Sequence, residues 1–206
     1  MVPYIIAGAT YAFAAAVQPG PFQAFLVART VTQGWRSTLP ASLAPLISDG
    51  PIILLVVLVL SRIPDSATQV LRLGGGLFLL YLAAGACRAW RTYRLELASD
   101  ARAARRTVIA AAFVNLLNPN PYLSWSLVLG PLLLKGWSES PERALALLVG
   151  FYTTMVATLA GLIVLFGRAG SLGPHVGRLL VGLSAVALAV FGSYQLWAGT
   201  RALLGN

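Results

Sequence analysis

The architecture of this chain follows from two tetrapeptides, Gln18-Pro19-Gly20-Pro21 and Asn118-Pro119-Asn120-Pro121. They lie one hundred residues apart, and each stands inside a stretch apolar enough to cross a lipid bilayer. Proline has no backbone N–H, and its ring clashes with the carbonyl four residues earlier, so each tetrapeptide must break or kink its helix. In hydrocarbon, a freed carbonyl is costly unless it meets protein partners or lines a cavity. The sequence therefore predicts two broken helices at matching places in its two halves.

The composition is that of an integral membrane protein. Of 206 residues, 58% are hydrophobic and only 10% are charged, and the mean hydropathy is +0.78. The charges divide the chain into apolar segments, most of them longer than the roughly 20 residues that a spanning helix needs. We therefore predict an all-α fold of six transmembrane helices, at about 3–28, 38–61, 69–91, 107–134, 144–167 and 177–200.

One connection, residues 92–106, is strongly basic and divides the chain into two halves. Six arginines lie in or next to it, against two acids. Because cytoplasmic loops carry an excess of Lys and Arg, we expect this loop to be cytoplasmic and both termini to lie outside. The net charge of +9 is then an anchor against anionic lipid headgroups rather than a nucleic-acid surface.

The two halves resemble each other beyond the proline tetrapeptides. Gly34-Trp35 follows the first tetrapeptide much as Gly136-Trp137 follows the second. With three spans in each half, the second copy must enter the membrane from the opposite face. We therefore expect one transporter-like domain over 1–206, made of two inverted repeats at about 1–91 and 107–206.

The helix breaks supply the first candidate binding groups. Pro21 and Pro121 suit the first position of a new half-helix, with Gly20 and Asn120 as N-caps. The unpaired N–H groups that follow attract an anion such as a carboxylate. The alternative is a pair of kinks whose polar neighbours only satisfy loose carbonyls. The candidate substrate-binding residues at the breaks are Gln18, Pro19, Gly20, Pro21, Gln23, Asn115, Asn118, Pro119, Asn120, Pro121 and Tyr122.

Asp49 is the one acid well inside a predicted span. A charge at the bilayer centre is costly, so such a residue is by default functional. We predict that Asp49 binds a substrate ammonium group or exchanges a proton. Because it precedes Gly50-Pro51, it could also cap the second half of a broken second helix.

The sequence lacks the residues that thiol–disulfide transfer or metal binding would need. Cys87 is the single cysteine, so a transmembrane thiol–disulfide relay has no second thiol. His175 is solitary, and His, Asp and Cys do not cluster as metal ligands. We expect no enzyme activity, no catalytic residue, no metal and no cofactor.

These residues resemble the LysE-type (LysE/RhtB) family of amino-acid exporters over essentially the whole chain. The matching residues are Pro19-Gly20-Pro21, Gly34, Arg36, Asp49 and Asn118-Pro119. The resemblance implies export of amino acids or related small metabolites across the bacterial inner membrane, driven by the proton gradient, from a homodimer. The family typically reads Asn-Pro-Lys in the fourth span, whereas Asn120 stands here in place of the lysine.

The prediction from sequence is a proton-coupled secondary transporter for an amino acid or a similar zwitterion, working by alternating access. The partners expected are this substrate, protons and the lipid bilayer. The alternatives are a non-transporting membrane scaffold or assembly protein and, less in keeping with the sequence, an exporter of an inorganic ion.

Overall fold

The computed structural model describes residues 1–59, 65–92 and 101–204. Within these ranges the chain is helical, 93% of it, and contains no strand. The elements are α1 (Val2–Val17), α2 (Pro21–Gln33), α3 (Trp35–Thr38), the 3₁₀ turn η1 (Leu39–Leu43), α4 (Ala44–Val59), α5 (Asp65–Arg91), α6 (Ala101–Leu116), α7 (Pro119–Ser124), the π-helical turn η2 (Trp125–Leu129), α8 (Gly130–Glu139), α9 (Pro141–Gly170) and α10 (Pro174–Leu204).

Four helical stretches of the described chain are long and apolar enough to cross a membrane. They are Trp35–Val56, Arg72–Arg91, Pro141–Gly170 and Pro174–Ala202. The predicted spans 3–28 and 107–134 are not among them, because each is divided at its proline tetrapeptide. Helix α1 ends at Val17 and α6 ends at Leu116, and after the second break the chain is helical again from Pro119 to Glu139. The all-α membrane class predicted from composition is confirmed.

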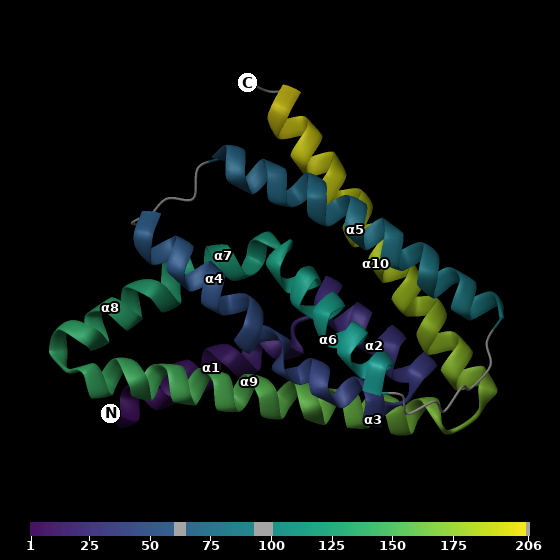
Figure 1. Cartoon of the computed structure of the whole chain (residues 1–206), viewed down its shortest axis with the longest axis horizontal. Coiled ribbons are helices and arrows are strands. Elements are labelled where there is room, and N and C mark those ends of the chain that lie inside the picture. Colours follow the sequence, from purple (N-terminus) through teal and green to yellow (C-terminus); the bar gives the residue numbers. More distant parts are fainter. Residues whose placement is uncertain (60–64, 93–100, 205–206) are drawn as a thin grey trace.

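Two helix pairs hold the molecule together, α1 with α9 and α5 with α10 (Figure 1). Glycine permits both close approaches. A Cβ atom on Gly150 would lie 2.5 Å from the carbonyl oxygen of Ile5, and one on Gly8 would meet the carbonyl of Leu147. In the second pair, a Cβ on Gly76 would lie 2.9 Å from the carbonyl oxygen of Gly192. Small residues serve this purpose in membranes, where apolar burial alone does not drive helices together.

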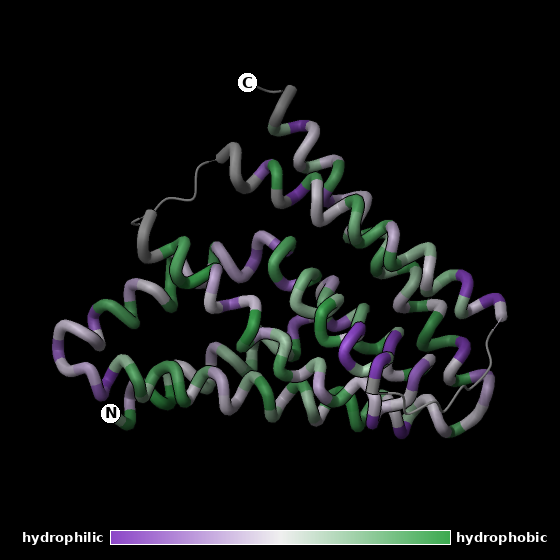
Figure 2. Tube along the Cα trace, viewed as in Figure 1, coloured by the Kyte–Doolittle hydropathy of each residue, from purple (hydrophilic) through white to green (hydrophobic). Residues whose placement is uncertain are grey.

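The connections richest in arginine meet at one end of the molecule, whereas Lys135 and Arg143 flank the α8–α9 turn at the other end (Figure 1). The α2–α3 connection, the end of α5, the start of α6 and the α9–α10 connection all lie at the first, basic end, on the right of the view. Figure 2 shows hydrophilic residues concentrated there and hydrophobic residues along the long helices. Gly34 closes α2 at the same end with φ of 85°, a left-handed conformation that favours glycine.

The structure of the second predicted span corrects the expectation that Asp49 could cap a half-helix. Helix α4 continues through Pro51 without a break, so Asp49 lies in a helix interior and does not cap a second half-helix. The irregular backbone lies earlier, in η1, where Pro40 follows Leu39 and the helix tightens to a 3₁₀ turn. Pro51 costs α4 only the hydrogen bond to the carbonyl of Ile47. One lost bond is compatible with a continuous helix when neighbouring helices hold it.

Candidate functional site

The first helix break is stabilised by a side chain from beyond it. Pro19 has no N–H, so the carbonyl of Ala15 loses its helical partner. The side-chain amide of Gln23 replaces it, donating to the carbonyl oxygens of Ala15 at 3.2 Å and Ala16 at 2.9 Å. Helix α2 then begins at Pro21 with Gly20 as N-cap, as the sequence predicts. No side chain caps α2, so its first N–H groups stay without a capping oxygen.

The second break follows the same plan with different residues. The phenol of Tyr122 donates to the carbonyl oxygen of Leu116 at 2.9 Å, back across the break. Asn118 is the N-cap, and its Oδ1 accepts from the backbone N–H of Asn120 at 3.1 Å. The expectation that Asn120 caps a helix starting at Pro121 is therefore wrong. Asn118 is an equally good cap and is likewise followed by a proline, so both starts are locally possible; the helix starts at Pro119, with Pro119 and Tyr122 buried.

The two breaks share one feature, although α2 starts at the second proline of its tetrapeptide and α7 starts at the first. Ala16 and Leu116 each lie three residues before the first proline of their tetrapeptide. In both, the carbonyl accepts from a side chain on the second half-helix. In this conformation Gln23 and Tyr122 therefore satisfy loose carbonyls, as the alternative interpretation of the breaks expects.

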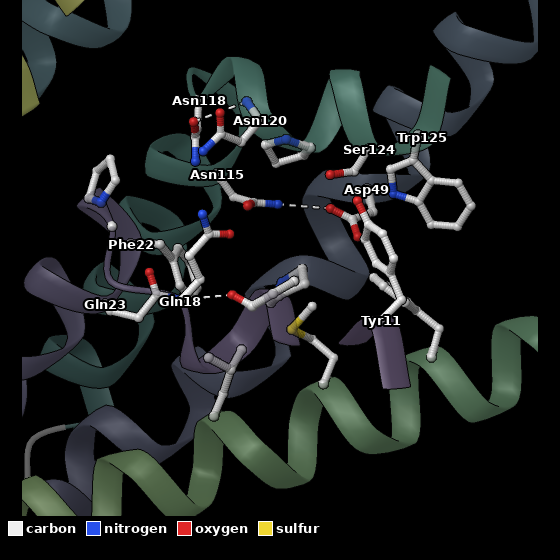
Figure 3. Close-up of a pocket in the computed structure, with 18 of the residues that line it drawn as sticks. Tyr11, Gln18, Phe22, Gln23, Asp49, Asn115, Asn118, Asn120, Ser124 and Trp125 are labelled. Carbon is white, nitrogen blue, oxygen red and sulfur yellow. Dashed lines mark hydrogen bonds between the residues drawn. The ribbon is translucent and has the colours of Figure 1, made fainter. Parts of the chain in front are cut away.

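Asp49 lies between the breaks and is almost completely buried, with 3% of its surface exposed. Its Oδ1 accepts from the side-chain amide of Asn115 at 2.8 Å, and its Oδ2 accepts from the hydroxyl of Tyr152 at 3.4 Å. The indole N–H of Trp125 points at the same carboxylate (Figure 3). Asn115 also donates to the hydroxyl of Ser48 at 2.7 Å. Asp49 is therefore held by donors from three other stretches of the chain.

All of these donors are neutral. In the part of the chain that the structure describes, the one salt bridge joins Arg143 to Glu139, on the exposed turn between α8 and α9. Burying a carboxylate is expensive unless a positive charge or a proton balances it. The site therefore presents a carboxylate whose balancing charge must come from outside the protein.

Asp49 faces a cavity of about 110 Å³ that residues of both helix breaks line (Figure 3). This is room for several water molecules or one small organic molecule. Ten of the twelve residues predicted from sequence line it. They are Gln18, Pro19, Gly20, Pro21, Gln23, Asp49, Asn115, Asn118, Asn120 and Pro121. Pro119 and Tyr122 do not line it, because both are buried in the packing of α7.

Sequence reasoning did not assign the apolar wall of the cavity to the site. Phe151, Met155 and Leu159 of α9 line the cavity opposite the polar groups. Their spacing of four residues places them on one helix face, a signal that any packed helix also gives. Tyr11, Ala15, Phe22, Pro45 and Leu129 complete the apolar and aromatic lining. Ser124 and Trp125 of the fourth predicted span line it as well.

A polar cavity between two broken helices, with one buried acid in a helical membrane protein, is typical of a transporter of small molecules. The chain belongs to the LysE type translocator family, whose model matches residues 13–199. The resemblance seen in the sequence motifs is thereby confirmed. Comparison with curated proteins and with solved structures gave no match.

Proposed function

We propose that this protein exports amino acids or related small zwitterions by proton-coupled alternating access. The observation that carries the proposal is the buried carboxylate of Asp49, which has only neutral donors and faces a cavity bounded by both helix breaks. A substrate with an ammonium group supplies the missing positive charge. The membrane translocator family to which the chain belongs supports transport as the activity.

The substrate carboxylate is assigned to the helix breaks. The N–H groups of Phe22 and Gln23 begin α2 without a capping side chain, and the start of a helix attracts an anion. The amides of Gln18, Asn118 and Asn120 line the same cavity as neutral donors. A zwitterion then bridges between Asp49 on one side and the breaks on the other, with its side chain against the apolar wall of α9.

Proton coupling follows from the same carboxylate. When the ammonium group leaves, a buried anion without a cation is unfavourable, and a proton is the other charge that can neutralise it. Asp49 would then carry either a substrate or a proton, but not both. Because the carboxylate binds only one of these two cations at a time, binding of one releases the other. This competition is the basis of exchange between them.

The helix pairing supports the inverted repeat. A pseudo-two-fold axis that relates the two halves exchanges the first, second and third spans with the fourth, fifth and sixth. It then requires α1 to pack on α9 just as α6 packs on α4, and both pairs are in contact. The α5–α10 pair maps onto itself. We propose one transporter domain of six spans in two such repeats, with the substrate near the midplane.

We further propose that the basic connection 92–106 is cytoplasmic, that both termini lie outside the bacterial inner membrane, and that the assembly is a homodimer. The end of α5 and the start of α6, both rich in arginine, lie at the same end of the molecule as the α2–α3 and α9–α10 connections, as this orientation requires (Figure 1). Reporter fusions at each connection test the orientation. A cytoplasmic signal from the turn between α8 and α9 would contradict it.

The decisive experiment measures thermal stabilisation of the purified protein by a panel of amino acids and small metabolites, together with proton-dependent export from proteoliposomes. Asp49→Asn should abolish both the stabilisation and the export. Glu142→Gln, an equal change of charge at the exposed start of α9, is the control and should preserve both. Undiminished proton-coupled export by Asp49→Asn would refute the assignment. If no compound stabilises the protein, and cells that carry Asp49→Asn behave like wild-type cells, a non-transporting scaffold would be favoured.

A further inference from the structure

A second cavity, of about 180 Å³, lies between α2, α5 and α10 and shares no lining residue with the first. Two arginines line it, Arg29 from α2 and Arg88 from α5. Both lie near the ends of their helices at the basic end of the molecule (Figure 1). Nothing in the transport proposal uses this cavity.

Neither arginine has a described carboxylate beside it to neutralise its charge. Within residues 1–59, 65–92 and 101–204, no carboxylate lies within salt-bridge distance of Arg29 or Arg88. Arg29 is partly buried, and its guanidinium lies over the ring of Phe25, 5.4 Å from the ring centroid. A cation–π contact weakly offsets this burial but does not balance the charge. An arginine near the end of a spanning helix lies at the level of the lipid headgroups, where a partly buried guanidinium without a counter-charge attracts an anion.

Apart from Thr32 and Tyr81, the rest of the lining is apolar. Ala28, Leu82, Ala86 and Leu188 form the apolar wall. Tyr81 lies at the rim with 73% of its surface exposed, and its hydroxyl has no hydrogen-bond partner in the described structure. A dissolved anion gains nothing from an apolar wall. A molecule with an anionic head and a hydrocarbon chain satisfies both parts of the cavity.

We propose that this cavity binds one anionic phospholipid, with its phosphate between Arg29 and Arg88 and the start of an acyl chain against Leu82 and Leu188. Arginine suits this role because its planar fork donates two hydrogen bonds to one phosphate. The hydroxyl of Tyr81 supplies a further donor at the rim. The bound lipid joins α2, which begins at the first helix break, to the α5–α10 pair.

The test uses the full chain, purified in a neutral detergent and titrated with phosphatidylglycerol or phosphatidylcholine, while lipid binding is measured by native mass spectrometry. We expect the wild type to bind phosphatidylglycerol preferentially. The double variant Arg29→Gln/Arg88→Gln should bind it at least about tenfold more weakly, as for the loss of one charge-assisted hydrogen bond. The control Arg91→Gln removes an arginine from the same helix end but outside the cavity, and should bind as the wild type does.

A second variant leaves both arginines in place. A Cβ on Gly85, which lines the cavity, meets no atom within 4 Å, so Gly85→Leu should fold normally and fill the cavity. It should lose phosphatidylglycerol binding like the double variant. Equal losses in Arg91→Gln and the double variant would show unspecific attraction and overturn the proposal. Thermal stabilisation by inorganic phosphate alone that equals the effect of the lipid would also overturn it, in favour of a soluble anion.

Discussion

The side-chain amide of Asn115 donates a hydrogen bond of 2.8 Å to Oδ1 of Asp49, and these two residues come from opposite halves of the chain. Asn115 lies one turn before the second helix break, and Asp49 lies inside α4. The bond therefore joins the two halves at the cavity itself. It also sets the direction in which the carboxylate faces.

The first prediction tests this pair. Asn115→Ala should weaken substrate-dependent stabilisation, because the carboxylate loses its shortest hydrogen bond and its fixed orientation. In a double-mutant cycle with Asp49→Asn, the two changes should show a coupling energy of about 0.5–3 kcal/mol in unfolding free energy. Asn120→Ala is the control, since its side chain lines the same cavity without bonding to Asp49. It should be additive with Asp49→Asn.

The second prediction concerns the α1–α9 contact. Gly150→Ala should destabilise the protein by about 1–3 kcal/mol, because the new Cβ would lie 2.5 Å from the backbone oxygen of Ile5. The control is on the same helix. A Cβ on Gly161 meets no atom within 4 Å, so Gly161→Ala should stabilise α9 by about 0.5–1 kcal/mol. Thermal unfolding in detergent measures both. Equal effects of the two substitutions would contradict the close approach.

The third prediction concerns the second break. Tyr122→Phe should cost about 1–3 kcal/mol, because the buried carbonyl of Leu116 loses a hydrogen-bond donor and gains none. The matched control, Tyr194→Phe, removes a hydroxyl from a side chain that is 62% exposed, and should be nearly neutral. If the two variants unfold at the same temperature, Tyr122 does not stabilise the break.

The fourth prediction concerns pH at the exposed turn between α8 and α9. Hydrogen bonds from Arg143 and Tyr4 hold the pKa of the Glu139 carboxyl below its ordinary value. A lowered pKa in the folded state stabilises the protein above the ordinary glutamate pKa of about 4.3, and this contribution is lost as pH falls through the lowered value. The wild type should therefore unfold at a slightly higher temperature than Glu139→Gln at pH 7. The difference should vanish in acid.

The helix breaks were predictable because their cause is local. A proline removes its own N–H whatever surrounds it, and two prolines within three residues, as in each tetrapeptide, remove two donors close together. The burial of Asp49 inside a membrane span was predictable in the same way, because the residues on either side of it are largely apolar. The predicted start of α2 at Pro21 was also correct. Gly20 is the single residue between Pro19 and Pro21, so it is the residue placed to cap this helix.

The errors arose where several residues could do the same work. Asn118 and Asn120 are equally good caps, and only the three-dimensional packing of Pro119 and Tyr122 selects the first. At Gly50-Pro51 the sequence indicated a break, yet α4 remains continuous. The partners of Asp49 could not be paired with it from sequence, because Asn115 and Tyr152 lie 66 and 103 residues away. Such contacts depend on which helices pack together, not on local preference.

The different packing of the first two helices has a mechanical consequence. Helix α1 is fixed on α9 through glycine contacts, whereas α2 packs mainly on α10. Residues 18–20 therefore join two parts of the chain that are held by different neighbours. A change in the angle between α9 and α10 must be taken up here, because torsions inside a helix cannot change without loss of hydrogen bonds. Proline fixes its own φ, so Gly20 is the residue free to rotate. Since Gly20 also lines the cavity, a movement of the helices and a change in the shape of the cavity are a single event.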